Sequence, residues 1–512
     1  MARRALGRLL LGTVLGVLAP IASPAQAQCP VQLSTRIPAL FEAPAVARSH
    51  WGLTVATETG TVLYDHQGDR FFTPASVQKL LTTAAALTVL GPDYTRSTTV
   101  TLAGASDPQL ILTGAGDPAF SRDDLAQLAQ TTAQQLQLRG IETVTHLWGE
   151  ESLSHGTQTP STWEFADTQA GYGAPLNSLM LTQNALPLVL HPRGVGEPLR
   201  LEWENPRDGL GWAVANRSRS GGPEEREWVR VGQSLREPIV EIQGLLRSGA
   251  PSEPVAIAAL APGERFLTEF AAALDRSGIR VQNQALIDPT GVGLVPSDWA
   301  GESLATYPSP SVAQLVATAN QTSQNLYAEA LVQWLGQPLA LGPGGVGSAA
   351  NTGANVPANP ESNPRGVPWE QGLDRLEATL VNLGIPGDQM VLADGSGLSR
   401  RNLLTPRATV ALLQALARSP HQTTYRQSLA IAGERGTLRW RFQGTNLEGR
   451  FQGKTGSMTG IYALAGYVQP PQFEPIVFSA FINHADASYG TLRQTLEAVV
   501  LELGQLQSCG PQ

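Results

Sequence analysis

The sequence is 512 residues long, which is more than one ordinary domain needs and favours two or three domains with proper cores. Its formal net charge is −8, and an acidic chain is a poor candidate for binding nucleic acid, so we expect no nucleic-acid partner. The seven histidines form neither an H-E-x-x-H motif nor a close His/Cys group, so we expect no metal and no other cofactor.

The N-terminus has the pattern of a secretory signal peptide. Three arginines lie within the first eight residues, an apolar run follows at Leu9–Leu18, and small residues mark positions 25 and 27. We expect residues 1–27 to be removed. A retained membrane anchor is the alternative, but the run is short for a bilayer, and Gln28 disfavours lipid attachment at Cys29. The mature protein is therefore expected outside the cytoplasm, with no integral membrane anchor.

Two cysteines, Cys29 and Cys509, lie near opposite ends of the mature chain. In an oxidising compartment a disulfide between them is plausible, since the ends of a domain often lie close together. Two unpaired thiols are the alternative.

The first elements along the chain are a hairpin and a helix. The runs Trp51–Ala56 and Thr61–Tyr64 flank a turn and read as two paired strands. A helix is predicted next, with Thr73 as its N-cap and Pro74 at its first position, continuing through Leu90.

Residues 97–298 differ in composition from the segments around them, with short strand-like runs among many glycines, prolines and tryptophans. This pattern predicts a mostly β insertion, which could comprise two nested subdomains. The clearest strand-like runs are Thr98–Leu102, Gln109–Thr113, Leu188–Leu190 and Trp228–Val231.

Helical periodicity returns at Ser311–Leu335 and at Trp369–Leu383. The Gly/Pro/Asn/Ser tract between them, residues 341–368, is expected to be a flexible loop because it has little apolar surface to bury. Part of it, residues 342–347, matches G-x-G-x-x-G, but no strand precedes it and no helix follows, so a dinucleotide site is not expected.

The C-terminal part predicts strands at Tyr462–Val468 and Ile476–Ile482 and a closing helix at Tyr489–Leu506. The N-terminal hairpin and these strands can share one sheet with helices on its faces. We therefore assign residues 28–96 and 299–512 to one domain that is interrupted by the insertion.

The chain contains only two lysines, Lys79 and Lys454, while its other 33 basic residues are arginine. Ser76 precedes Lys79 by three positions, so on a helix the two side chains share a face. Near a helix N-terminus a serine hydroxyl can become a nucleophile if a neighbouring lysine with a lowered pKa accepts its proton, which arginine cannot do. One alternative is that mutational drift replaced most lysines with arginine and left these two by chance. The other is that a single S-x-x-K motif is a coincidence.

Two further motifs follow in order: Ser323-Gln324-Asn325, and Lys454-Thr455-Gly456-Ser457 before a strand. The ordered set S-x-x-K, S-x-N and K-T-G is the signature of β-lactamases and penicillin-binding proteins. Three motifs in the correct order make coincidence improbable.

The chain resembles the low-molecular-mass class C penicillin-binding proteins, which are D-alanyl-D-alanine carboxypeptidase/endopeptidases. The gap between Ser76 and Ser323 is far too wide for a β-lactamase, whereas this family carries a large β insertion there. The resemblance extends over nearly all of the mature chain. Supporting segments are residues 114–118 (GAGDP), 394–400 (DGSGLSR), 436–438 (GTL) and 464–467 (LAGY). Two departures are Gln324, where an S-D-N form has aspartate, and the added tract at residues 341–368.

The resemblance implies an α/β fold in which an antiparallel sheet is flanked by helices, as in penicillin-binding and β-lactamase-like transpeptidase domains. It also implies catalytic roles for three residues. Ser76 would attack the carbonyl between two D-alanines, Lys79 would accept its proton, and Ser323, held by Lys79 and Lys454, would relay a proton to the departing amine. The substrate is then the peptidoglycan stem peptide or crosslink, and β-lactams are covalent inhibitors.

Four residues are implied in substrate binding. Asn325 would bond the substrate backbone, Lys454 would supply positive charge, and the hydroxyls of Thr455 and Ser457 would hold the terminal carboxylate. The oxyanion hole would comprise the backbone N–H groups of Ser76 and Ser457. The glycines and small residues of the 394–400 loop suit a tight turn near the pocket, so the loop is expected to shape the site rather than to give Ser396 or Ser399 a direct catalytic task. Asp394 is expected to be a turn or cap residue.

Other functions stay open on the sequence. A catalytically idle peptidoglycan-binding scaffold would keep the fold, and a β-lactamase or esterase would use the same Ser/Lys machinery. A Ser-His-Asp hydrolase is not supported because no histidine lies in a recognisable motif and no G-x-S-x-G elbow accompanies one. The balance between carboxypeptidase and endopeptidase activity is not fixed by the sequence.

Overall fold

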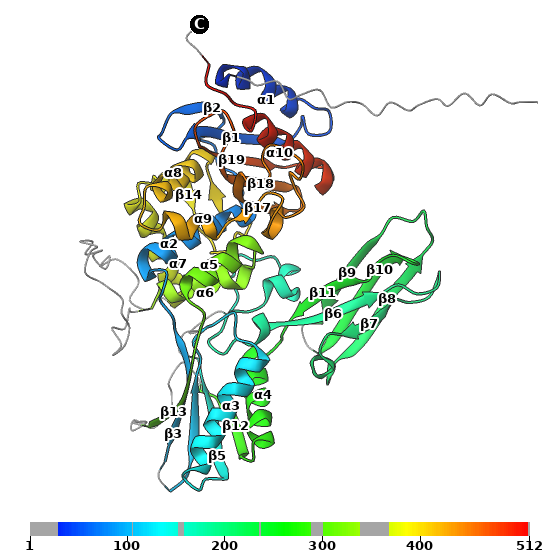
Figure 1. Ribbon diagram of the computed structural model, residues 1–512. Coiled ribbons are helices and arrows are strands. Elements are labelled where there is room, and N and C mark those ends of the chain that lie inside the picture. Colours follow the sequence, from blue (N-terminus) through cyan, green and yellow to red (C-terminus); the bar gives the residue numbers. More distant parts are fainter. Residues whose placement is uncertain are drawn as a thin grey trace, which may run out of the picture.

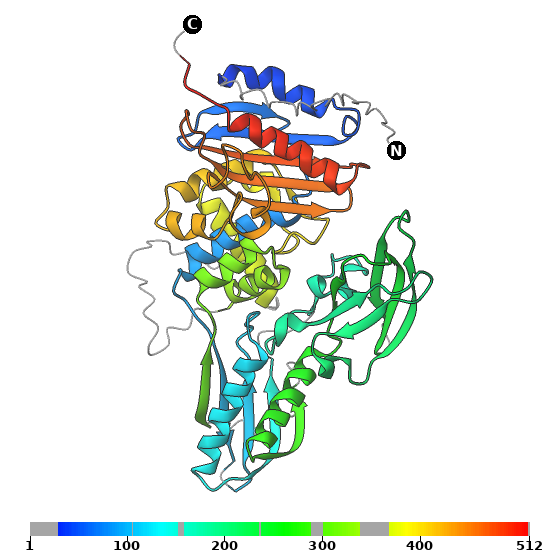
Figure 2. The same cartoon turned by 45° about the vertical axis from the view of Figure 1, so that its right-hand side comes forward.

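The computed structural model describes residues 29–104, 106–151, 158–234, 237–287, 301–337 and 368–509. The expected signal peptide and nearly all of the expected flexible loop at residues 341–368 lie outside these ranges. The described chain has three parts: one made from both ends of the sequence, an elongated unit below it, and a β unit at the side (Figures 1 and 2).

A six-stranded antiparallel sheet organises the part that contains both chain ends. Strand β1 pairs with β19 along its full length, and the N-terminal hairpin therefore shares a sheet with the last strands, as predicted. In spatial order the strands are β16 (Ala430–Ile431), β17 (Phe451–Met458), β18 (Ile461–Val468), β19 (Ile476–Asn483), β1 (His50–Thr57) and β2 (Val62–His66).

Helices cover both faces of this sheet, so its central strands are apolar on both sides. Helices α1 (Leu33–Phe41) and α10 (Tyr489–Leu503) pack on one face, and neighbouring residues of β19 show the alternation: Phe478 joins this core and Val477 the opposite one. The opposite face carries α2 (Lys79–Leu90), α5 (Val312–Gln321), α6 (Asn325–Leu335), α7 (Pro368–Asn382), α8 (Pro406–Ala417) and α9 (Gln422–Gln427), with the short pair β14 (Met390–Val391) and β15 (Leu403–Leu404).

Two predicted helices differ from the observed ones at points that matter for the site. The helix predicted to start at Thr73-Pro74 begins later, with a 3₁₀ turn at Ala75–Gln78 that leads into α2. The Thr73 backbone N–H donates to Asn483 Oδ1 (2.8 Å), and Ala75 has a left-handed φ of 46°, so no regular α-helix begins at Pro74. The helix predicted at Ser311–Leu335 is two helices, α5 and α6, separated at Ser323, whose φ is 62°.

The elongated unit is a five-stranded sheet with two helices on one side (Figure 1). The helices were not predicted, although Leu125, Leu128 and Leu136 recur at helical spacing and Ser121 caps the first helix. The sheet also includes β13, which lies beyond the boundary expected at residue 298. Its elements are β3 (Ser97–Ala103), β4 (Gln109–Thr113), α3 (Arg122–Gln137), β5 (Thr143–Glu150), α4 (Pro262–Arg276), β12 (Arg280–Leu286) and β13 (Glu302–Pro308).

The β unit at the side is inserted between β5 and α4 and contains two three-stranded sheets around one apolar core. One sheet has the order β8-β10-β9 and the other β11-β6-β7. The strands are β6 (Ala185–His191), β7 (Arg200–Trp203), β8 (Ala213–Gly221), β9 (Trp228–Gln233), β10 (Ile239–Arg247) and β11 (Glu253–Ala258).

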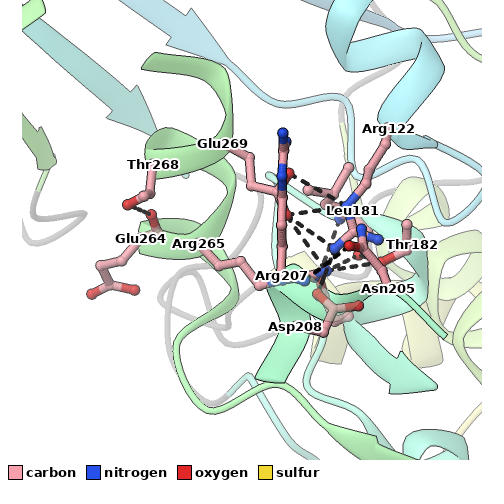
Figure 3. A network of polar contacts seen from close by, with 11 residues as sticks. Arg122, Leu181, Thr182, Asn205, Arg207, Asp208, Glu264, Arg265, Thr268 and Glu269 are labelled. Atoms are coloured by element: carbon pink, nitrogen blue, oxygen red, sulfur yellow. Dashed lines mark hydrogen bonds and ion pairs between the residues drawn. The ribbon is translucent and has the colours of Figure 1, made fainter. Parts of the chain in front are cut away.

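A charged network joins the β unit to the helices of the elongated unit (Figure 3). Asp208, which follows β7 and is buried, accepts hydrogen bonds from Arg122 of α3 (2.5 Å) and Arg265 of α4 (3.0 Å). Arg122 also contacts Glu269 of α4 (3.0 Å). Two arginines thus compensate a buried carboxylate, which would be left unpaired if both were removed.

The two ends of the described chain are tied together by a disulfide between Cys29 and Cys509, which confirms the predicted bridge. Helix α1, which follows Cys29, packs beside α10, which precedes Cys509. Over the ranges that the structure describes, no helix combines the length and the apolar character needed to cross a bilayer.

Candidate active site

The first motif lies where the 3₁₀ turn passes into α2. Lys79 Nζ is 2.9 Å from Ser76 Oγ, so the i, i+3 spacing brings the two side chains together as the sequence predicts. Lys79 Nζ also donates to Asn325 Oδ1 and to the backbone carbonyl of Ser396, both at 2.7 Å. An ammonium group has three hydrogen atoms to donate, and these three acceptors use all of them.

Lys79 has no solvent exposure, and this has an electrostatic consequence. Burial lowers the pKa of Lys79 to about 7, although the charges of Asp394 and Glu329 act in the opposite direction. Near neutral pH the amine therefore exchanges a proton readily, as a general base must.

The second and third motifs meet at a separate lysine. Lys454 Nζ of β17 donates to Ser323 Oγ at 2.8 Å and to the Thr455 carbonyl at 2.7 Å. Burial and the nearby Lys79 charge lower the pKa of Lys454 well below its usual range. Of the two lysines, Lys454 is thus the one that donates a hydrogen bond to Ser323. The expectation that Lys79 also holds Ser323 is wrong for this structure, because Asn325 takes that hydrogen bond.

Strand β17 runs directly beside the nucleophile turn, which explains the glycine of its motif. A Cβ added to Gly456 would lie 2.8 Å from the Pro74 carbonyl oxygen and 3.0 Å from the Ser76 backbone nitrogen. Only glycine lets strand and turn approach this closely. The next residue, Ser457, faces the cleft, and Thr455 Oγ1 is hydrogen-bonded to Thr437 Oγ1 (3.0 Å).

A cleft of about 440 Å³ opens over these motifs. Five of the seven predicted site residues line it: Ser76, Ser323, Asn325, Thr455 and Ser457. The other two, Lys79 and Lys454, are buried behind it and reach it through the hydroxyls they contact. The three distant stretches of chain therefore converge on one site.

The insertion contributes one wall of the cleft, which the sequence did not reveal. Asp167 and Tyr172 line it, and the Tyr172 carbonyl accepts a hydrogen bond from Asn325 Nδ2 (2.9 Å). Both polar atoms of the Asn325 side-chain amide are thus fixed: Oδ1 accepts from Lys79, and Nδ2 donates to the insertion. A backbone carbonyl has no sequence signature, so only the folded chain could disclose this contact.

The loop at residues 394–399 supports the site from behind, with Asp394 acting as the expected turn residue. Its buried carboxylate accepts from the backbone N–H groups of Gly397 (2.6 Å) and Ser399 (2.5 Å). Trp163 of the insertion donates its indole N–H to the same carboxylate (2.9 Å). Gly397 has a φ of 82°, and any Cβ there would collide with the Ala75 carbonyl of the nucleophile turn.

Arg400, Arg441 and Tyr489 also line the cleft and were not singled out as site residues from the sequence. Arg400 pairs with Glu164 of the insertion (2.6 Å), and Arg441 pairs with Glu497 of α10 (2.5 Å). In the described residues no group of three or more His, Cys, Asp or Glu side chains is arranged to hold a metal ion.

The sequence matches the family described as D-Ala-D-Ala carboxypeptidase 3 (S13) over residues 33–353 and 359–502. The chain belongs to this family. The resemblance to the class C penicillin-binding proteins is thereby confirmed.

Relatives and solved structures of this S13 peptidase agree in fold and family. It is 30% identical over 499 residues to the D-alanyl-D-alanine carboxypeptidase of Actinomadura sp. (strain R39), covering 93% of this chain and 85% of that protein. It is 25% identical to the penicillin-sensitive carboxypeptidase A of Dictyostelium discoideum, covering 84% of this chain and 82% of that protein. The crystal structure of penicillin binding protein 4 (dacB) from Haemophilus influenzae superposes with a TM-score of 0.73 at 21% identity, covering 92% of this chain and 99% of that one, which establishes the α/β fold.

Proposed function

We propose that this S13 peptidase is a serine D-Ala-D-Ala carboxypeptidase/endopeptidase that acts on peptidoglycan stem peptides and crosslinks. The observation that carries the mechanism is the 2.9 Å contact between Ser76 Oγ, which lines the cleft, and the buried amine of Lys79. Family membership supplies the reaction class, since the matching family is one of D-Ala-D-Ala carboxypeptidases.

In the acylation step Ser76 Oγ forms a bond to the carbonyl carbon of the penultimate D-alanine. Lys79 in its neutral form accepts the hydroxyl proton. The bond from that carbonyl to the terminal residue then breaks, and Ser323 passes a proton to the departing amine and receives one from Lys454, which holds its hydroxyl. In the second step water attacks the acyl-enzyme and gives one proton back to Lys454 through Ser323. Lys79 returns its proton to Ser76, and the shortened peptide leaves as a carboxylic acid.

The remaining residues orient the peptide. Asn325, fixed by Lys79 and by the Tyr172 carbonyl, offers its amide to the substrate backbone. Lys454 supplies positive charge, and Thr455 and Ser457 face the cleft where their hydroxyls would receive the terminal carboxylate. The backbone N–H groups of Ser76 and Ser457 are proposed as the oxyanion hole, because β17 and the nucleophile turn are in contact.

β-Lactams are proposed to acylate Ser76 and to form an acyl-enzyme that is hydrolysed slowly. The relative from D. discoideum is named penicillin-sensitive, and a structure of the H. influenzae protein was solved with a β-lactam bound. Transport across the inner membrane and a periplasmic or wall-associated location are proposed from residues 1–27 and from the wall-bound substrate.

Incubation with a fluorescent penicillin tests the proposal. We expect one label per chain on the wild type, none on Ser76→Ala, and release of D-alanine from a D-Ala-D-Ala peptide. No label on a folded wild type would favour the idle scaffold, and rapid turnover of the penicillin would favour a β-lactamase. Muropeptide separation after digestion of purified peptidoglycan measures the balance between trimming and crosslink cleavage.

A further inference from the structure

A buried glutamate, Glu329, lies behind the amine of Lys79 and has no place in the motifs described above. It is on α6, one turn after Asn325, so the two side chains project from the same face of that helix. Its side chain has no solvent exposure. A fully buried carboxylate is rare unless it is compensated, and this one has several donors.

The donors to Glu329 come from the loop that supports the site. Glu329 Oε1 accepts from the backbone N–H groups of Ser396 (2.8 Å) and Gly395 (3.1 Å). Trp369 of α7 donates its indole N–H to Oε2 (2.9 Å). The carboxylate therefore fixes two consecutive peptide groups of the loop and links them to a third element.

These same residues present their carbonyl groups to α2. The Ser396 carbonyl accepts from Lys79 Nζ (2.7 Å), and the Gly395 carbonyl accepts from Thr82 Oγ1 (2.6 Å). A continuous line of hydrogen bonds thus runs from Glu329 through Ser396 to Lys79 and on to Ser76 Oγ. If the Ser396 carbonyl turned away, Lys79 would lose one of its three acceptors and part of its orientation toward Ser76.

Glu329 also belongs to the small set of charges around Lys79. Asp394 faces Lys79 from the loop, Glu329 from α6, and Lys454 from β17. The two carboxylates raise the pKa of Lys79 against the effect of burial. Burial, together with the Asp394 charge, raises the pKa of Glu329 itself to about 7. Each group thus affects the proton affinity of the others.

We propose that Glu329 is a positioning residue for Lys79: its carboxylate orients the Ser396 carbonyl toward the amine and places an acidic group behind it. The inference rests on the proposed function, since it takes Lys79 to be the group that accepts the Ser76 proton. The alternative is a purely structural role, in which Glu329 only joins α6, α7 and the loop.

Two substitutions separate charge from geometry. Glu329→Gln keeps the shape but removes the charge and places an N–H₂ group among N–H donors. Glu329→Asp keeps the charge but shortens the reach. The matched control is Glu151→Gln, which neutralises another buried glutamate, one that accepts from Asn177 in the insertion and does not line the cleft.

The measurement is the rate constant of acylation by a fluorescent penicillin between pH 5 and pH 9, with the melting temperature of each variant. In Glu329→Gln we expect an acylation rate about 10- to 100-fold lower, because small displacements of reacting groups have effects of this size. We also expect the acidic limb of its pH–rate profile, where the rate rises as Lys79 loses its proton, to move to lower pH by about one unit. The reason is that the Glu329 carboxylate no longer favours the charged form of Lys79. Glu329→Asp should lose rate but keep the wild-type limb, and Glu151→Gln should keep both.

The result that overturns the inference is a Glu329→Gln profile with the wild-type limb and a rate within about twofold of wild type, or a limb shift that Glu151→Gln shares. The endpoint of labelling reports separately on the proposed function. A wild type that never becomes labelled contradicts the proposed function, whereas a variant that labels fully at an unchanged rate contradicts only the role of Glu329.

Discussion

Replacing Gly456 with alanine tests whether the close approach of β17 to the nucleophile turn is needed for acylation. The added Cβ would lie 2.8 Å from the Pro74 carbonyl oxygen, and ordinary van der Waals contact begins at 3.4 Å, so turn and strand must separate by about 0.6 Å. The nearest atoms are backbone or Cβ atoms, which cannot rotate away. Overpacking of this kind lowers the free energy of unfolding by about 1–3 kcal/mol.

The effect on catalysis should be larger than the effect on stability. The separation moves the Ser76 backbone N–H, a proposed oxyanion donor, relative to Ser457, and a displacement of about 1 Å can reduce a rate about 100-fold. We therefore expect Gly456→Ala to acylate about 10- to 100-fold more slowly while its melting temperature falls by a few degrees.

Stopped-flow labelling with a fluorescent penicillin and differential scanning calorimetry measure the two quantities. Gly387→Ala is the matched control, because a Cβ there meets nothing nearer than Val381 Cγ2 at 3.5 Å. If Gly456→Ala acylated at the wild-type rate, the contact between β17 and the turn would not position the oxyanion donors.

Three other predictions concern separate features. Lys79→Arg should abolish penicillin labelling while the protein remains folded by circular dichroism, because a guanidinium cannot accept the serine proton; full labelling would remove Lys79 from the role of base. The double substitution Cys29→Ser and Cys509→Ser should lower the free energy of unfolding by about 2–5 kcal/mol in denaturant titrations, and an unchanged midpoint would show that the bridge adds no stability. Asp208→Asn should make the junction of the β unit more susceptible to limited proteolysis without changing the rate of penicillin labelling. The control Glu225→Gln alters an exposed ion pair and should change neither the proteolysis nor the labelling rate. Equal proteolysis of the two variants would contradict the importance of the network in Figure 3.

The parts of the site that were predicted correctly are those encoded by local spacing or by a recognised motif. Ser76 and Lys79 are three residues apart, so any helical turn brings them together. The meeting of Ser323 with Lys454 followed from the ordered motifs, since nothing in the two local sequences specifies their pairing. The shared sheet could be inferred because strand patterns lie near both ends of the chain.

The parts that were missed depend on tertiary contacts through backbone groups. The carbonyls of Tyr172 and Ser396 bond Asn325 and Lys79, yet a carbonyl is the same in every residue. The break between α5 and α6 was missed because the apolar periodicity continues through it, while the left-handed φ of Ser323 is imposed by the fold. Glu329 could have been suspected, since a charged residue within an otherwise apolar helical run must find buried partners.

The pairing of β1 with β19 constrains the order in which the molecule can assemble. His50 is aligned with Asn483, so an inner pair of strands in the catalytic sheet joins residues that lie far apart in the sequence. A chain growing from its N-terminus contains Ser76 and Lys79 early, but β1 has no β19 beside it until residues Ile476–Asn483 have been made. The intervening units can fold before that point, because their strands pair among themselves. Ser76 and Lys79 are therefore synthesised long before the sheet that positions them can be completed.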